Sequence, residues 1–359
     1  MAQGLGVARV TVFGAFSVAL VVMALCGPPV GRVIDAGRGR GLLVASNLVL
    51  AAGLAFLGAA TGEATLFAAW CVLGVGMGMG LYDSAFAILV RLHGPAARGA
   101  ITGITLIAGF ASTVGWPLSA WLDAHYGWRE ACFAWAAINL FIALPLNYFC
   151  IPPASPGPGK AQGEMISEGP EEVQRHAFLL LALFSALTAF VTSAMAAHLP
   201  GLLLATGVSS AAALGAAALV GPAQVLARLA EFFATQQFRH HPLLTARWAT
   251  ALHPVGAAAL WALGGAPLAA SLFAFVHGAG NGLITIAKGT LPLAIFGAAG
   301  YGERQGWLAV LARIMQALAP YAFGVVLDGY GVHAALVVSG GLSLAAVGAL
   351  FGLKKTATH

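Results

Sequence analysis

Charged side chains are scarce in this sequence, and their scarcity excludes most classes of protein. Only 8% of its 359 residues are Asp, Glu, Lys or Arg, whereas soluble chains carry about 25%. So few charges cannot cover a surface that faces water. This excludes cytosolic enzymes, secreted disulfide-rich scaffolds, disordered chains and nucleic-acid-binding proteins. The meaning of the net charge of +5 therefore depends on the positions of the Lys and Arg residues along the chain.

Cysteine is also rare, and no catalytic or metal-binding spacing is present. Cys26, Cys71, Cys132 and Cys150 all fall inside apolar runs, so we interpret them as small apolar side chains and predict no metal site. The sequence has no Ser-His-Asp arrangement and no phosphate-binding loop. It therefore predicts neither an enzyme nor an ATP-driven pump, and it requires no cofactor.

Long apolar runs take up most of the chain, of which 60% is hydrophobic. Runs long enough to cross about 30 Å of hydrocarbon recur throughout. Glycine is abundant, at 47 residues, and in apolar helices it permits close packing. We predict an all-α membrane protein with eleven transmembrane helices, at residues 11–31, 41–60, 66–90, 100–122, 131–151, 177–199, 210–235, 248–264, 268–292, 308–327 and 334–353.

One long polar connection, 152–176, divides these spans into five and six. Its prolines, glycines and glutamates forbid a buried helix and keep it in water. The predicted domains are therefore an N-terminal helix bundle at 1–151, a cytoplasmic linker at 152–176 and a C-terminal helix bundle at 177–359.

Loop cations set the predicted orientation, because cytoplasmic loops are enriched in Lys and Arg. Arg9 and Arg129 lie on one side of the predicted spans. The other side carries Arg32, Arg38, Arg40, Arg91, Arg98, Lys160, Arg175, Arg239, Arg247, Arg304, Lys354 and Lys355. We therefore expect the linker and the C-terminus in the cytoplasm and Met1 outside, unless another helix precedes it. The expected location is a bacterial inner membrane.

The two halves repeat each other at an interval of six spans. Arg32-Val-Ile-Asp35 after the first span resembles Arg228-Leu-Ala-Glu231 after the seventh. GMGMGL in the third span resembles GAGNGL in the ninth, and a Tyr-Gly pair follows both the fourth and the tenth. The repeat unit therefore contains six helices, but only five helices form its first copy. We predict that one helix is missing at the N-terminus.

The segment Gly31-Arg-Val-Ile-Asp35-Ala-Gly-Arg-Gly39-Arg40 resembles the loop signature of the major facilitator superfamily. The general character of the chain is loosely similar to the bacterial oxalate/formate and monocarboxylate porters. This resemblance implies a fold of two helix bundles related by a pseudo-two-fold axis, with twelve helices of which the first is missing here. It implies that Gly31, Asp35, Gly39 and Arg40 belong to a cytoplasmic gate, with Arg228 and Glu231 as the gate of the second half.

Some residues depart from the family pattern. Ala36 stands where the signature usually has Arg, and Gly41 stands in place of its final basic residue. Gly115-Trp116-Pro117 matches only part of the proline motif of the family's antiporters. Export and proton antiport are therefore not indicated by motif.

Ionisable groups inside the membrane are costly and are treated as functional candidates. The candidate substrate-binding residues are His277, Asn281, Thr285 and Lys288, which share one helical face, together with Arg313 and Gln316. Asp83 has two interpretations. It is either the proton-coupling site, with Lys288 as a candidate partner across the cavity, or a brace for Arg40.

The buried cations favour a small organic anion as the substrate. We expect a secondary active transporter that moves this anion by alternating access. We expect it to work as a monomer and to have no nucleic-acid partner. Protons or a counter-substrate would drive it. Two alternatives stay open: proton-coupled efflux of amphiphilic drugs, and a truncated membrane protein that senses a substrate without transporting it.

The missing first helix gives a prediction that needs only the gene. Translation in frame upstream of Met1 is expected to encode about 20 apolar residues preceded by cations, which is the length needed to cross a bilayer. Sequencing the upstream region tests this. A stop codon directly before Met1 would contradict it and would favour the truncated, non-transporting alternative.

Overall fold

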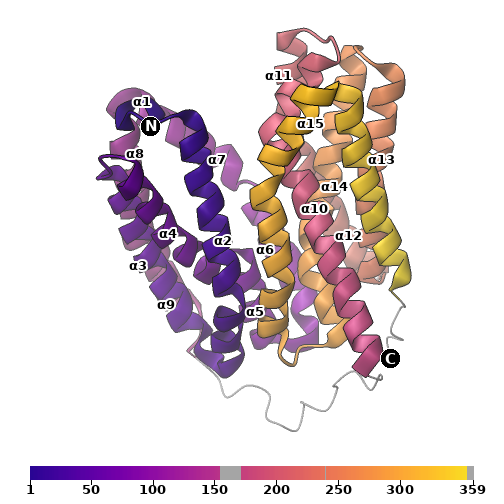
Figure 1. Ribbon diagram of the computed structural model, residues 1–359. Helices are drawn as coiled ribbons and strands as arrows, with labels where there is room; N and C mark the ends of the chain where they lie inside the picture. The colour runs from indigo at the N-terminus through magenta and orange to yellow at the C-terminus, as the bar shows by residue number, and fades with distance from the viewer. Residues whose placement is uncertain (154–170, 239, 354–359) are drawn as a thin grey trace. The chain divides into compact units, whose positions relative to one another are not determined.

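The structure, a computed structural model, describes residues 1–153, 171–238 and 240–353, and within these ranges every regular element is a helix (Figure 1). The first half contains α1 Ala2–Leu5, α2 Arg9–Val33, η1 Ile34–Arg38, α3 Gly39–Gly58, α4 Glu63–Gly80, α5 Tyr82–His93, η2 Gly94–Ala96, α6 Ala97–Ala108, α7 Ala111–Tyr126, α8 Trp128–Ile138, η3 Asn139–Ala143 and α9 Leu144–Cys150. The second half contains α10 Glu171–Ala205, α11 Ser210–Ala218, α12 Val220–Phe238, α13 Pro242–Leu263, α14 Pro267–Phe296 and α15 Tyr301–Gly352. The predicted all-α fold is confirmed.

Many of these helices are long enough to cross a membrane. Among the described residues, seven helical stretches have the necessary length and composition when helices that continue through a bend are joined. Three of them, Val10–Gly58, Glu63–Ala108 and Tyr301–Gly352, contain 49, 46 and 52 residues. Since about 20 residues cross the hydrocarbon, each of these three is long enough for two crossings.

Several helix boundaries differ from the predicted spans. The predicted helix at 66–90 is broken at Leu81, whose backbone is extended (ψ −167°), so α5 starts anew at Tyr82. The predicted helix at 100–122 is likewise divided into α6 and α7. In addition, α10 begins at Glu171, so the last residues of the predicted polar connection are helical, while residues 154–170 of that connection lie outside the described residues.

The described chain groups into two compact units that interleave in sequence. The first contains residues 1–94, 114–166 and 298–317, and the second contains 95–113, 167–297 and 318–359. Thus the first part of α15 belongs with the N-terminal helices, and α6 belongs with the C-terminal ones. The division at residues 151 and 177 into two bundles stays a prediction.

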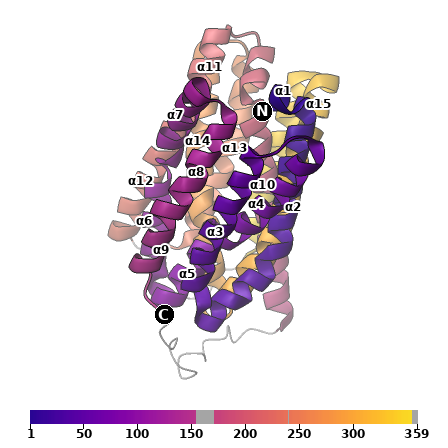
Figure 2. The ribbon, with the colours of Figure 1, turned by 90° about the vertical axis from the view of Figure 1, so that its left-hand side faces the viewer.

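In the first unit, α4 packs between α2 and α3, and α3 continues against α8 and α9 (Figure 2). The start of α15 runs antiparallel to α2. Ser17 donates a hydrogen bond to the Ala317 carbonyl (3.3 Å), while Gly31 approaches the backbone at Gly302 closely. Glycine is required at this approach, because a Cβ on Gly31 would overlap the Gly302 carbonyl.

In the second unit, α14 is the central helix and packs against α12, α13, α11 and α10. Its glycines face two neighbours in turn. Gly278 and Gly282 lie against α12 at Val220 and Gln224, whereas Gly280 lies against α13. The central helix is therefore held by backbone-to-backbone contact, the packing mode expected of glycine-rich apolar helices.

The same packing recurs in the first unit and corrects the register of the repeat. Gly74 and Gly78 of α4 lie against α2, and Gly76 lies against α3. By packing, Gly278 therefore corresponds to Gly74 or to Gly78, because Gly76 and Gly80 both lie against α3. The alignment of GMGMGL with GAGNGL was wrong by two residues. The two sequences match at the glycines, but the aligned glycines contact non-equivalent neighbouring helices.

A second match supports the repeat. The glycine of the first Tyr-Gly pair, Gly127, has φ 88° and ψ 164°, and that of the second, Gly331, has φ 81° and ψ 178°. Only glycine adopts this backbone region readily. Both glycines mark the point at which one helix ends and the next begins.

The glycine packing gives a test of stability. Gly78→Ala is expected to lower the free energy of unfolding by about 1–3 kcal/mol, because the added Cβ would lie 2.9 Å from Cβ of Cys26. Gly103→Ala is the matched control, since a Cβ on Gly103 of α6 would meet nothing within 4 Å. The control should stabilise by up to about 1 kcal/mol. Thermal unfolding in detergent measures both, and equal shifts would contradict the packing.

Candidate functional site

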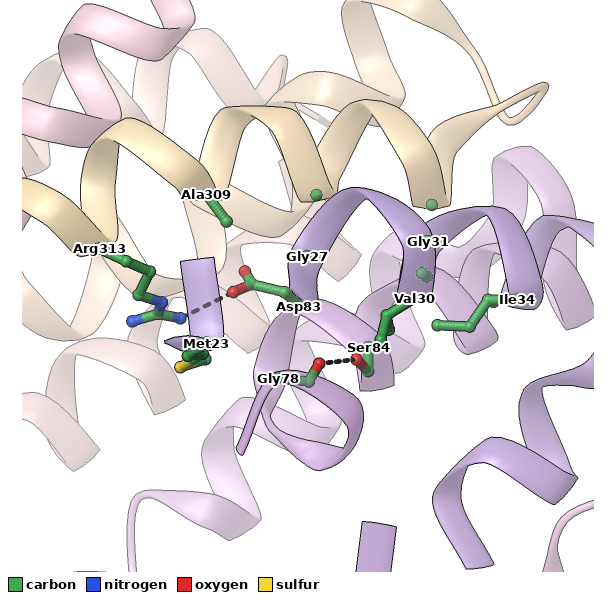
Figure 3. A pocket seen from close by; sticks show the side chains of 13 residues that line it. Met23, Gly27, Val30, Gly31, Ile34, Gly78, Asp83, Ser84, Ala309 and Arg313 are labelled. Carbon is green, nitrogen blue, oxygen red and sulfur yellow. Dashed lines mark hydrogen bonds and ion pairs between the residues drawn. The ribbon is translucent and has the colours of Figure 1, made fainter. Parts of the chain in front are cut away.

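An ion pair between α5 and α15 is the centre of the candidate site in the first unit. Nη2 of Arg313 lies 2.7 Å from Oδ2 of Asp83. The two side chains point toward each other in Figure 3. They are 22% and 24% exposed, so water screens the pair only in part, and the charge-assisted bond is a strong one.

Two glutamines complete the cluster. Nε2 of Gln305 donates to Oδ1 of Asp83 (3.1 Å), so both carboxylate oxygens are bound. Oε1 of Gln316 accepts from Nη1 of Arg313 (2.8 Å). Among the described residues, Nε of Arg313 and Oε1 of Gln305 are buried without a hydrogen-bond partner. One buried donor atom and one buried acceptor atom of the cluster are therefore not used by its internal bonds.

The backbone places Asp83 and Arg313 in this position. The break at Leu81 begins a new helix at Tyr82, which brings Asp83 into the first turn of α5. There its charge is favourable, because helix N-termini are electropositive. Arg313 projects from the part of α15 that runs along α2.

A small cavity adjoins the pair. Its lining includes Met23, Ser84 and Ala309 beside Asp83 and Arg313 (Figure 3). Its volume of about 20 Å³ is room for a single water molecule. An organic substrate therefore does not fit here in this conformation.

The signature loop lies at the start of the same helix. The two Asp35 carboxylate oxygens accept hydrogen bonds from the backbone N–H groups of Gly302 and Glu303, both at 2.9 Å. Asp35 thus caps the N-terminus of α15, where it satisfies two donors and neutralises the helix dipole. Arg32 lies 3.5 Å from Glu303 at an exposed position, where an ion pair contributes little.

The other predicted gate residues of the first half have packing roles. Gly39 leaves room for Ile88 of α5, since a Cβ there would lie 2.7 Å from Cγ1 of Ile88. The Arg40 guanidinium lies 4.4 Å from the ring centroid of Tyr148. Asp83 contacts Arg313 and Gln305 in the first unit, so the interpretation of Asp83 as a brace for Arg40 finds no support in these contacts.

Glu231 forms a buried cluster in the second unit. Its Oε1 accepts from Oγ1 of Thr245 (2.9 Å) and of Thr235 (3.0 Å). It also lies 3.4 Å from Nη2 of Arg98 and 3.2 Å from Nε2 of His240. The carboxylate therefore joins α6, α12 and the start of α13, which suits the predicted role as a gate but leaves that role a prediction.

Arg228, one turn before Glu231, binds backbone carbonyls. Its Nη1 donates to the Thr105 carbonyl (2.9 Å) and its Nε to the Gly282 carbonyl (3.3 Å). The side chain is buried, at 4% exposed. It links α6, α12 and α14.

The four candidates on α14 follow the predicted helical face, but they differ in surroundings. Oδ1 of Asn281 accepts from Oγ1 of Thr192 on α10 (3.0 Å). Thr285 donates to the Asn281 carbonyl (2.9 Å), and Lys288 is half-buried. His277 is buried against the ring of His253 on α13.

Of the predicted substrate residues, the structure thus brings Arg313 and Gln316 together with Asp83, while the α14 residues belong to the other unit. Sequence reasoning did not single out Gln305, Arg98 or His240. Gln305 had a signal, since it lies two turns before Arg313 on one helix. No sequence signal links Arg98 to Glu231. Within the described residues, no three metal-ligating side chains gather.

Comparison with known proteins gives consistent results. The family profile described as Major Facilitator Superfamily matches residues 1–246. An uncharacterized 38 kDa protein of Thermoproteus tenax, encoded in a 23S RNA operon, is 31% identical over 147 residues, 41% of this chain. That alignment spans only 38% of the relative's length.

Solved structures are similar in fold over nearly the whole chain. The human organic anion transporter TETRAN has a TM-score of 0.68 and 18% identity, covering 97% of this chain and 87% of its own. FucP in the outward conformation has a TM-score of 0.72 and 13% identity, covering 97% of both chains. The proton:xylose symporter XylE has 0.74 and 13%, covering 94% and 85%.

The cap on α15 predicts a stability difference. Asp35→Asn is expected to lower the free energy of unfolding by about 1 kcal/mol, because the charge facing the N-terminus is lost. Asp123→Asn removes an exposed carboxylate near the end of α7 and should have no such cost. Thermal unfolding in detergent compares the two. A loss in Asp123→Asn as large as in Asp35→Asn would contradict the capping role.

Proposed function

Because this chain belongs to the Major Facilitator Superfamily, we propose that it is a secondary active transporter that moves a small organic anion across the membrane by alternating access. The family profile covers more than half of the chain, and the helices are long and apolar enough to lie in a bilayer. The family is one of membrane transporters, not enzymes. The substrate class and the coupling are the proposed part.

The single observation that supports an anionic substrate is the cluster around Arg313. A guanidinium binds a carboxylate through two parallel hydrogen bonds. Asp83 is a carboxylate already bound at 2.7 Å, in a region that is largely apolar. The Asp83 carboxylate therefore occupies the position at Arg313 that a carboxylate of the substrate would take.

Replacement of Asp83 by the substrate would couple binding to structural change. A carboxylate that takes over Arg313 leaves Asp83 without its cation, and a partly buried charge without a partner is costly. Asp83 must then take up a proton or turn to water. Since the adjoining cavity holds about 20 Å³, about one water molecule, the substrate enters only after α5 and α15 separate locally.

The predicted gate fits this sequence of events. Asp35 caps the N-terminus of α15 and Gly31 lies against Gly302, so the start of α15 is held by two hydrogen bonds and a close backbone approach. Contacts of this kind form and break as a unit when helices move. We propose that Gly31, Asp35, Gly39 and Arg40, with Arg228 and Glu231 in the second unit, form the cytoplasmic gate.

One observation favours a second candidate, the efflux of amphiphilic cations. The Asp83 carboxylate could itself receive a cation beside the apolar wall formed by Met23, Val30 and Ile34. Its present cation is Arg313, which a drug would have to displace. The anion transporter and sugar symporter among the similar structures share only the fold, so their substrates do not decide the matter.

The proposed setting is a bacterial cytoplasmic membrane, with the C-terminus and the polar connection in the cytoplasm. The bias of Lys and Arg toward the loops on that side supports this orientation. The proposed partners are the substrate, the lipid bilayer and a proton or counter-ion, and the proposed working form is a monomer.

Ligand-dependent unfolding tests the anionic substrate. The purified chain in detergent is heated with small carboxylates, inorganic oxyanions or cationic drugs. A carboxylate present at 100 times its Kd should stabilise by about 2.7 kcal/mol. Arg313→Gln should abolish this shift, and Arg313→Lys should weaken it, because lysine keeps the charge but loses the two-pronged geometry.

Arg32→Gln is the matched control, since it removes an arginine that is 62% exposed, and it should leave the shift unchanged. A shift with cationic drugs alone, abolished by Asp83→Asn, would contradict the anion proposal and favour efflux. Carboxylate shifts that persist in Arg313→Gln would contradict Arg313 as the anchor.

A further inference from the structure

Two buried histidines pack together in the second unit, away from the Arg313 cluster. His253 of α13 is 3% exposed and His277 of α14 is 5% exposed. Their ring centroids lie 4.6 Å apart, with the ring planes inclined by 31°. Ionisable side chains at the centre of apolar helices are costly and mark functional sites by default.

The surroundings of the pair are shaped to hold the two rings. Phe273 stacks on His277 with a centroid distance of 6.1 Å and an angle of 22°. Gly280 leaves room for His253, because a Cβ there would lie 2.7 Å from its Cδ2 and Nε2. The three rings therefore form one stack between α13 and α14.

Packing alone does not require a histidine here. By the faces of the glycines, His277 corresponds to Leu73 or to Met77 in the first unit, and both are apolar. An apolar side chain thus fills this position in the repeated half. The packing of this fold therefore does not depend on an imidazole at this position.

The polar atoms of His253 are not satisfied in this conformation. Among the described residues, neither ring nitrogen of His253 has a hydrogen-bond partner. The backbone of His277 lies nearby without full hydrogen-bond geometry. Buried polar groups are nearly always paired, and the exceptions call for a functional explanation.

A proton is the ligand that this site suits. A protein zinc site uses at least three protein ligands, and the described residues bring no third ligand to this pair. Two imidazolium ions this close would repel strongly in an apolar environment.

We propose that His253 and His277 form a proton-binding site separate from Asp83, neutral while α13 and α14 pack as in the structure and binding one proton when these helices separate. The reason is that both N–H groups of an imidazolium need acceptors, and among the described residues neither ring nitrogen of His253 has a hydrogen-bond partner. The assignment rests on the proposed function for its role in transport and adds a second group, besides Asp83, that can bind a coupling proton.

The charges around the pair are consistent with a single proton. Lys288 lies on the same helix as His277, three turns further along α14, and is half-buried. α11 carries no ionisable residue. Ionisable side chains on the other neighbouring helices contact other groups: Arg98 contacts Glu231, Arg228 the Gly282 carbonyl, His198 the Pro320 carbonyl and His333 the Trp261 ring.

Hydrogen–deuterium exchange against pH tests the proposal without a substrate. The full chain in lipid nanodiscs is measured between about pH 8 and pH 5, with correction for intrinsic exchange. Opening of α13 and α14 should increase by up to tenfold per pH unit, the dependence expected for one proton. His277→Phe keeps an aromatic stack but cannot bind a proton, so it should abolish this dependence, and His253→Gln should do the same.

His333→Phe is the matched control, because it replaces a histidine that contacts α13 through the Trp261 ring but lies outside the stack, and it should keep the wild-type dependence. Exchange of α13 and α14 that does not respond to pH would overturn the proposal. So would a dependence that persists in both His277→Phe and His253→Gln. Since only protons are varied, either result is distinct from a failure of the anion proposal.

Discussion

The hydrocarbon of a bilayer offers no hydrogen-bond partner, and this constraint organises the whole structure. Every charged group inside the helices must find a partner within the protein. Arg313 binds Asp83, Glu231 binds Arg98, and Arg228 binds backbone carbonyls. These partners come from helices distant in sequence, so each charge also fixes one helix against another. The same few charges therefore hold the helices together and are the groups that we propose act in transport.

Close backbone packing makes these polar contacts possible. Gly31 allows α15 to approach α2, and the approach puts Asp35 at the N-terminus of α15. In the second unit Gly280 leaves the space that His253 occupies. Small residues thus serve two purposes: they bring helices together by dispersion and shape, and they create the positions in which an ionisable side chain meets its partner.

The positions of the helices could be predicted from the sequence, because hydropathy is read along the chain and membrane helices are continuous. The signature Gly31-to-Arg40 also predicted the family. Breaks and partners could not be predicted. An extended Leu81 leaves no compositional signal, and Asp83 meets Arg313 at a separation of 230 residues. The internal repeat could be recognised from the sequence. Its alignment could not, because it depends on which neighbouring helix each glycine contacts, and only the packed structure shows that.

The central claim is that Arg313 anchors an anion whose transport is coupled to a second ion. Uptake of radiolabelled small carboxylates into proteoliposomes, with and without an imposed proton gradient, tests it most directly. The account predicts accumulation of a carboxylate that depends on the gradient and is lost in Arg313→Gln. Accumulation of a cationic amphiphile with no uptake of any carboxylate would contradict it.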